Sequence, residues 1–330
     1  MKKHIRMNIT AVLVAAVAFS ALVGSHTYAQ AANTNANVLK VSPVRSDVEV
    51  KPGESKDVRT TVTNLTNSPI TVRSVENDFI ASNKEDGSPA LILDENKFAP
   101  THSLKRFMKP IGDVTIPAKG SKDIMVTITP PLQAQAGGYF GAVRFVPVTA
   151  NGDAQVNLNA SAASLILLSV PGNVVEKLDM TKFEIQQDGK AGSFFQSSND
   201  LQAAVRFENK GGAQEGPFGK VTVTQNGSVV YEADFNNDTP RQVILPDSAR
   251  AWDIPLKKIG SFGNYTVTAT FSYGKKNQTI EVTKSFWVVP QIVIIATIVG
   301  VLVLVLFVIA IVLLVRNNKR HGLKHRGFRH

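Results

Sequence analysis

Cysteine is absent from the 330-residue chain. Its absence excludes disulfide frameworks, cysteine-ligated zinc, iron–sulfur clusters and thiol nucleophiles, so burial of apolar side chains has to stabilise the fold. Histidine is scarce as well: of the six in the chain, only His102 lies between residues 30 and 315. A Ser-His-Asp site in that part of the chain would have to use this single residue.

The chain also lacks an excess of positive charge once its two ends are set aside. It has 36 lysines and arginines against 26 acidic residues, but nine of the cations lie at the ends, which leaves 27 against 26. These nine are Lys2, Lys3, Arg6, Arg316, Lys319, Arg320, Lys324, Arg326 and Arg329. Because a nucleic-acid footprint needs cations gathered over a folded face, nucleic acid is not an expected partner.

Motifs for catalysis are missing too. The sequence contains no Gly-x-Ser-x-Gly elbow, phosphate loop, dinucleotide fingerprint or His-Glu-x-x-His pair, so we expect neither an enzyme nor a cofactor. A hydrolase using paired carboxylates is one alternative. However, acids such as Glu76 and Asp78, or Glu85 and Asp86, have the positions of ordinary strand-end and loop charges.

No metal site is expected either. Residues 234–238 place oxygen ligands at alternating positions, as a calcium loop begins. Thr239 stands where such a loop needs glycine, and Leu245 where it needs glutamate. The segment is therefore predicted to be a solvated turn.

The first 29 residues have the form of a cleavable secretory signal. Cations in residues 1–8 precede an apolar run from Ile9 to Val23, and small residues at Thr27 and Ala29 suit cleavage at Ala29 or a nearby alanine. An uncleaved anchor is the alternative. The short apolar run and the Ala- and Asn-rich residues 30–37 favour cleavage.

A second apolar segment, residues 290–315, is predicted to be a transmembrane helix. It contains no charged residue from Ile292 to Val315, which is long enough to cross about 30 Å of hydrocarbon. A buried core helix is the alternative, but so long a run without a polar face is hard to place in a soluble domain.

The residues around this span predict its orientation and its contacts with lipid. Trp287 precedes the span, where amphipathic rings favour the membrane interface. Arg316, Lys319 and Arg320 follow it and open a basic tail, residues 316–330, that has no acid. This charge bias predicts a single-pass protein of the cell membrane with a cytoplasmic tail, contact with the lipid bilayer and an extracellular body.

Strand patterns run through that body. Residues 265–273 alternate apolar and polar side chains, Val221 and Val223 alternate with threonines, and residues 165–170 form a continuous apolar run. Asn226-Gly227 is a hairpin signal, and Lys51-Pro52-Gly53-Glu54 and Pro117-Ala118-Lys119-Gly120 both predict type II turns.

Weak helical periodicity makes a pair of β-sandwiches the economical architecture. We place the first domain at residues 38–172 and the second at 173–287, with the boundary at Pro171-Gly172-Asn173. Gly137, Gly138 and Gly141 predict close packing rather than a binding cleft. In both Tyr139-Phe140 and Phe194-Phe195 we expect one ring to face the core and the other to face outward.

Several segments resemble a known family. Residues 42–72, including Lys51-Pro52-Gly53-Glu54-Ser55 and Asn64-Leu65-Thr66-Asn67-Ser68-Pro69, resemble the opening of an immunoglobulin-like domain of WxL-interacting surface proteins. Residues 116–130 and Gly137-Gly138-Tyr139-Phe140-Gly141 are similar to the second half of that domain, and residues 230–267 to the domain that follows it.

The resemblance implies two tandem immunoglobulin-like domains in a membrane-anchored surface protein of a bacterium without an outer membrane. It implies that the first domain binds cell-wall peptidoglycan or another wall polymer and that the second binds an extracellular or surface protein, a non-catalytic adhesion role. No ligand-contacting residues are carried over from the family.

One cationic segment stands out in the neutral body. Its members are Lys97, His102, Lys105, Arg106 and Lys109. No acid lies between Glu95 and Asp113, so the segment is a candidate site for anionic wall polymer, with Arg106 suited to bidentate contact. The alternative is a solvated connection held to the sandwich by its apolar residues.

A different function is the leading alternative for the whole chain. Residues 42–72 also look like the immunoglobulin domains of periplasmic chaperones. In that case the protein is an assembly factor for surface proteins, and an exposed strand edge receives a segment of a client by strand addition.

Overall fold

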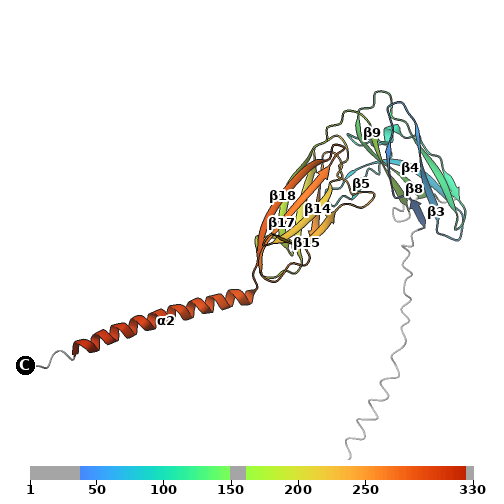
Figure 1. Ribbon diagram of the computed structural model, residues 1–330. Helices are drawn as coiled ribbons and strands as arrows, with labels where there is room; N and C mark the ends of the chain where they lie inside the picture. Colours follow the sequence, from blue (N-terminus) through green and yellow to red (C-terminus); the bar gives the residue numbers. More distant parts are fainter. Residues whose placement is uncertain (1–37, 149–160, 325–330) are drawn as a thin grey trace, which may run out of the picture.

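The computed structural model describes residues 38–148 and 161–324, and within its last helix it describes side chains only as far as Arg316. The predicted signal sequence, residues 1–29, lies outside the described residues. Two β-sandwiches follow one another along the chain, and one long helix leaves the second (Figure 1). The predicted all-β fold class, with tandem immunoglobulin-like sandwiches and a C-terminal apolar helix, is confirmed.

The first sandwich contains two sheets. A three-stranded sheet of order β1-β3-β7 packs on a six-stranded sheet of order β2-β9-β8-β4-β5, in which β6 pairs with β4. The elements are β1 (Leu39–Ser42), β2 (Arg45–Glu49), β3 (Lys56–Asn64), β4 (Ile70–Ala81), β5 (Pro89–Leu91), the 3-10 helix η1 (Lys105–Phe107), β6 (Val114–Ile116), β7 (Ser121–Ile128), β8 (Gly137–Pro147) and β9 (Ala162–Val170). The chain changes sheets between β1, which pairs with β3, and β2, which pairs with β9.

The second sandwich has a four-stranded sheet, β11-β10-β13-β16, and a five-stranded sheet, β12-β18-β17-β14-β15. Its strands are β10 (Leu178–Gln187), β11 (Lys190–Ala191), β12 (Phe194–Phe195), β13 (Leu201–Asn209), β14 (Phe218–Gln225), β15 (Ser228–Phe235), β16 (Ser248–Pro255), β17 (Gly263–Tyr273) and β18 (Gln278–Val288).

Alternation along the strands builds both cores, as the sequence predicts. Tyr265, Val267 and Phe271 of β17 are at most 1% exposed in the core of the second sandwich, where the Phe271 ring meets Phe207 of the facing sheet. In β9, Ile166 and Leu168 enter the core of the first sandwich, while Leu167 is buried on the opposite face of the same sheet. Each such side chain stabilises the fold by about 1.5–3 kcal/mol.

The turns agree with the sequence. Asn226 and Gly227 have φ angles of 50° and 80° and join β14 to β15, as expected of a hairpin. Gly53 has φ 81° and takes the third position of the turn that Lys51 opens. In Pro117–Gly120 the hydrogen bond from Gly120 N–H to Pro117 C=O makes glycine the last residue, and the positive φ of 54° falls on Lys119. A positive φ at the third position fits the predicted type II turn, with lysine in the place that glycine usually takes.

Helix α2 (Gln291–Lys324) is the only helix in the described residues that is long and apolar enough to cross a membrane, over Gln291–Arg316. None of that segment is buried, so the buried-helix alternative is wrong. Trp287 is 47% exposed just before the helix, and Arg316 is exposed near the end of its apolar part. Lys319 and Arg320 belong to the last turns of α2, beyond the described side chains.

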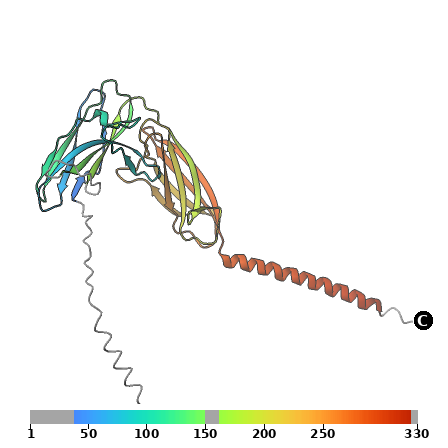
Figure 2. The same ribbon diagram turned by 180° about the vertical axis from the view of Figure 1, so that it is seen from behind.

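The two sandwiches meet at an angle, and α2 leaves from the end of the second that is remote from the junction (Figures 1 and 2). At the junction, Gly138 N–H donates to Gly212 C=O over 2.9 Å. A Cβ atom on Gly137 would lie 2.6 Å from the same carbonyl oxygen, and one on Gly138 2.7 Å from Gln214 Oε1. Gly137 and Gly138 therefore allow close packing between the two sandwiches, where the sequence predicts a bulge or close packing of neighbouring strands.

A second contact comes from the hairpin between β4 and β5. Arg206 Nε and Nη2 donate to the two carboxylate oxygens of Glu85, both over 2.7 Å, and Ala251 N–H donates to the Glu85 carbonyl over 2.8 Å. The hydrogen bonds from Arg206 hold the pKa of Glu85 below its ordinary value. Since both side chains remain about one-third exposed, solvent screens this pair and its contribution is modest.

Replacement of Gly137 by alanine tests the junction. Gly137 has φ 146° and a backbone oxygen in the place of a Cβ, whereas Gly189 has φ 73° and nothing within 4 Å of that place. We expect Gly189→Ala to cost about 1 kcal/mol of unfolding free energy for its backbone angle. Gly137→Ala is expected to cost about 1–3 kcal/mol more, because the domains must move apart. Denaturant titration of the purified chain measures both, and equal losses would contradict this account of the junction.

Candidate functional site

The predicted cationic segment is organised by a buried carboxylate. Asp78, in β4, is fully buried, and its oxygens accept hydrogen bonds from Ala99 N–H (2.8 Å), Ser103 Oγ (2.6 Å) and Lys105 N–H (2.8 Å). The interpretation of Asp78 as an ordinary strand-end charge is therefore wrong. Its neighbour Glu76 also has a structural role, because its carboxylate accepts from Ile111 N–H over 2.9 Å.

Most cations of the segment are engaged locally. Lys97 pairs with Asp94 at 3.4 Å, and the Lys105 ammonium donates to the Glu95 carbonyl. Lys105 and Arg106 lie over the exposed Phe98 ring, 5.1 and 4.4 Å from its centroid. Lys109 is exposed, but its backbone N–H is bonded to Thr127 C=O. The five residues thus do not converge on one cleft, and wall binding by this segment stays a prediction.

His102 has a structural position. It adopts φ 57°, its Nδ1 lies 2.6 Å from the Gly138 carbonyl, and its ring contacts those of Tyr139 and Phe140. Phe140 is 2% exposed, and Tyr139 is partly buried on the opposite face of β8. The expectation of an outward ring is therefore wrong for this pair, whereas Phe194 (54% exposed) and Phe195 (6%) divide as predicted.

Replacement of Asp78 by asparagine tests its role. An amide offers one acceptor oxygen where the carboxylate uses both, so at least one backbone N–H of the 99–105 segment loses its partner. We expect a loss of about 1–3 kcal/mol in unfolding free energy. Thermal or denaturant unfolding measures it, with exposed Asp94→Asn as the control. A variant as stable as the wild type would refute the proposed role of the buried carboxylate.

The strongest candidate for a binding site is the open edge of β2. This strand pairs with β9 in parallel, from Arg45 opposite Leu165 to Glu49 opposite Ser169. Leu165 N–H bonds Val44 C=O, and Val50 N–H bonds Ser169 C=O. Since a parallel ladder uses alternate residues, the even-numbered residues of β2 face β9 and the odd-numbered ones direct their peptide groups away from it. β2 is the last strand of its sheet.

This edge faces a groove between the two sandwiches. The groove has a volume of about 620 Å³ and is lined on one side by Arg45 and Asp47 of β2. Residues 214–216, 239–241 and 274–275 and Phe218 of the second sandwich line the other side. The Arg45 guanidinium closes part of it, donating to Asp47 Oδ1 and to the Arg241 carbonyl, both over 2.9 Å. An unpaired strand edge therefore lies beside open space.

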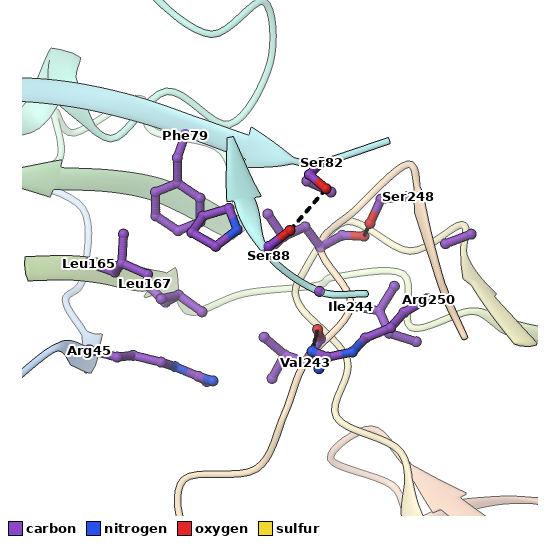
Figure 3. A pocket seen from close by; sticks show the side chains of 15 residues that line it. Arg45, Phe79, Ser82, Ser88, Leu165, Leu167, Val243, Ile244, Ser248 and Arg250 are labelled. Carbon is purple, nitrogen blue, oxygen red and sulfur yellow. Dashed lines mark hydrogen bonds between the residues drawn. The ribbon is translucent and has the colours of Figure 1, made fainter. Parts of the chain in front are cut away.

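A smaller pocket of about 110 Å³ lies next to Arg45, and Figure 3 shows its lining. Phe79, Leu165 and Leu167, on the outer face of the larger sheet of the first sandwich, supply its apolar floor. Val243, Ile244 and Leu245 of the second sandwich approach from the opposite side, and Ser82 and Ser88 are hydrogen-bonded at its rim (3.0 Å). Small-molecule sites usually exceed about 300 Å³, so this pocket suits one apolar side chain.

A second guanidinium borders the pocket. Arg250 donates to Val243 C=O (3.2 Å) and to Gln242 Oε1, and it packs on Trp252 and against Gly87. Its Nε is buried and has no partner. Burial lowers the pKa of Arg250 from its ordinary value; the charge of Asp86 opposes this shift, and the nearby charge of Arg45 adds to it. An anionic group placed between Arg45 and Arg250 would be favoured for the same electrostatic reason.

Glu215, on the far wall of the groove, is 4% exposed. Burial, followed by the charge of Glu176, raises its pKa to about 7. Because the folded pKa exceeds that of the unfolded chain, this group costs nothing below about pH 4.5 and progressively destabilises the fold as the pH rises to about 7.

Glu215→Gln is accordingly expected to match the wild type near pH 4 and to be more stable by about 3 kcal/mol at pH 8. Unfolding midpoints between pH 4 and pH 8 measure the difference. Glu281→Gln, at an exposed position of β18, should show no comparable change with pH. A constant offset between Glu215→Gln and the wild type at every pH would rule out titration of this carboxyl.

Sequence reasoning missed the groove, the pocket and both of the arginines beside them. Arg45 and Arg250 are separated by two hundred residues and have no shared motif. The one available signal was the short, largely polar segment Arg45–Glu49, since charged residues are typical of an edge strand.

No protein-family model and no curated protein matches the chain. Among solved structures, the chain is similar to the class 5 fimbriae chaperone CfaA, with 14% identity, coverage of 76% of this chain and 99% of that one, and a TM-score of 0.38. The E. coli chaperone DraB matches with 16% identity, coverage of 76% and 98%, and a TM-score of 0.30. A chain of the Salmonella enterica SafA pilin complex with the SafB chaperone matches with 13% identity and a TM-score of 0.33. The match covers 74% of this chain and 96% of that one. At these values the likeness is one of fold.

Proposed function

We propose that the chain is a membrane-anchored, non-catalytic binding protein that receives an extended segment of another surface protein along the open edge of β2. The observation that carries this proposal is the unpaired edge of Arg45–Glu49 beside the groove between the sandwiches. Strand addition to such an edge supplies backbone hydrogen bonds that are independent of the client's sequence. This is the chaperone-like assembly role, and we favour it over adhesion to peptidoglycan.

The neighbouring pocket would add selectivity. A bound strand places alternate side chains on the two faces of the sheet, so one of them can enter the apolar pocket over Leu165 and Leu167. Arg45 and Arg250 favour an anionic group of the client at the same place. The expected client segment is therefore short, extended and apolar, with a carboxylate beside the apolar residue.

The anchor supports the same role. We propose that α2 crosses the cell membrane once, with the sandwiches outside and the basic tail in the cytoplasm. A client that emerges from the membrane would then meet the groove at high effective concentration, so each contact can be weak. The resemblance to WxL-interacting proteins predicts the same topology.

Cross-linking in cells identifies the client. A photoreactive amino acid replaces Asp47, which lines the groove, or Val229, which is 61% exposed on the edge strand β15 and serves as the control. We expect a discrete surface protein to cross-link at position 47 and not at 229. Equal products at both positions would indicate non-specific contact and count against the proposal.

A proline then tests the strand edge itself. Asp47→Pro removes an outward N–H while leaving the ladder to β9, which uses the neighbouring residues, intact. Asp47→Ala is the matched control, because it also loses the ion pair with Arg45 but keeps the N–H. For the captured client segment, made as a peptide, we expect Asp47→Pro to bind about tenfold more weakly than Asp47→Ala, a difference of about 1.4 kcal/mol. Equal affinities measured by calorimetry would exclude strand addition at β2.

A further inference from the structure

Three exposed aromatic rings lie at the end of the second sandwich from which α2 departs. Phe194 is 54% exposed, Phe262 55% and Trp287 47%. They come from three separate segments, namely β12, the connection between β16 and β17, and β18. We call them the aromatic rim.

Backbone pairing brings the rim together. Phe194 pairs with Trp287 in the parallel contact of β12 and β18, and Asn264 pairs with Trp287 from the other side. Phe262 directly precedes Gly263, which pairs with Val288, so it lies still nearer to the start of the helix. Trp287 N–H bonds Ser193 C=O and Val289 N–H bonds Phe195 C=O, both over 2.8 Å. The rim is therefore attached to the strand that leads into α2.

These three rings are exposed although the core beneath them is complete. Phe195, Tyr265 and Phe286 lie in β12, β17 and β18 and are at most 6% exposed. The Phe286 ring stacks on Tyr265 and meets Phe195 edge to face. The apolar positions that the core requires are filled, and three further rings remain outside. Trp rings are favoured at the boundary between water and hydrocarbon, and Phe rings enter the same layer on the apolar face of interfacial segments.

We infer that the aromatic rim rests in the interfacial layer of the bilayer that α2 crosses, so that the second sandwich lies directly on the membrane. This inference rests on the membrane anchorage in the proposed function and goes beyond it. The occupant is lipid because only two residues separate the end of β18 from α2, so the rim is continuous with the span. Rings held on three paired segments also restrict the tilt of the whole sandwich.

The charges at this end are nearly balanced. Lys190, Lys257 and Lys258 are exposed there, and Asp188 and Asp200 lie in turns at the same end of the sheet. Attraction to anionic headgroups therefore contributes little net energy, and burial of the rings provides the binding. We expect the contact to persist in uncharged lipid.

Depth-dependent fluorescence quenching tests the inference on the full chain. The protein contains two tryptophans, so Trp252→Phe with Trp287→Phe gives a background without tryptophan. Into it we would place Phe194→Trp, Phe262→Trp or, as a control on the first sandwich, Phe98→Trp, a position that is 42% exposed. Each variant is reconstituted, one chain per nanodisc, in phosphatidylcholine brominated at shallow or deep acyl positions.

We expect loss of emission at positions 194 and 262 with shallow bromines, a smaller loss with deep ones, and none at position 98. The same pattern in discs with added phosphatidylglycerol would show that charge is not the cause. Unquenched emission at 194 and 262 from chains that remain in discs would overturn the inference while leaving the anchor in place. The same measurement is made in discs that hold two chains. Emission at positions 194 and 262 that escapes quenching only in those discs would also overturn the inference, since a second copy of the chain would then cover the rim.

Discussion

The close backbone approach between Gly137–Gly138 and Gly212 helps to set the position of the two sandwiches relative to each other. No disulfide joins the two sandwiches, and the ion pair at Glu85–Arg206 is screened by solvent. Other contacts between them include the hydrogen bonds to Glu85 C=O and from Arg45 to Arg241 C=O, and apolar packing around the pocket. The groove lies between β2 and the second sandwich, and Arg45 crosses part of it. A side chain at Gly137 would push the two sandwiches apart and so change the shape of the groove, although Gly137 does not line it.

The fold itself was largely predictable. Alternation in residues 265–273, the continuous run 165–170 and Asn226-Gly227 are local signals, and local physics determines what they form. The turn at Pro117–Gly120 is local as well, although its positive φ falls on Lys119 and glycine takes the last position of the turn.

The site was less predictable, since its parts are not neighbours in sequence. The cationic segment was identified from its composition alone. In the structure, Lys97 and Lys105 contact neighbouring residues of the chain, and the Asp78 carboxylate accepts hydrogen bonds that hold the segment in place. Burial of a carboxylate has no signature in one sequence. Arg45 and Arg250 could not be predicted as partners in one site, because only the arrangement of the two sandwiches brings them to the same pocket. Charge density therefore identified a segment of the chain, whereas the groove and the pocket depend on residues that only the fold brings together.

The pairing of β18 has a mechanical consequence. In the proposed membrane-anchored state, a pull on the sandwiches is transmitted through α2 and enters the second sandwich along β18. That strand is joined to β17 over eleven paired positions, from Gly263–Val288 to Tyr273–Gln278, and β12 grips its end from the other side. The load is thus carried in shear by many hydrogen bonds at once, and not by peeling them one after another. The tether is placed where the sandwich resists extension best.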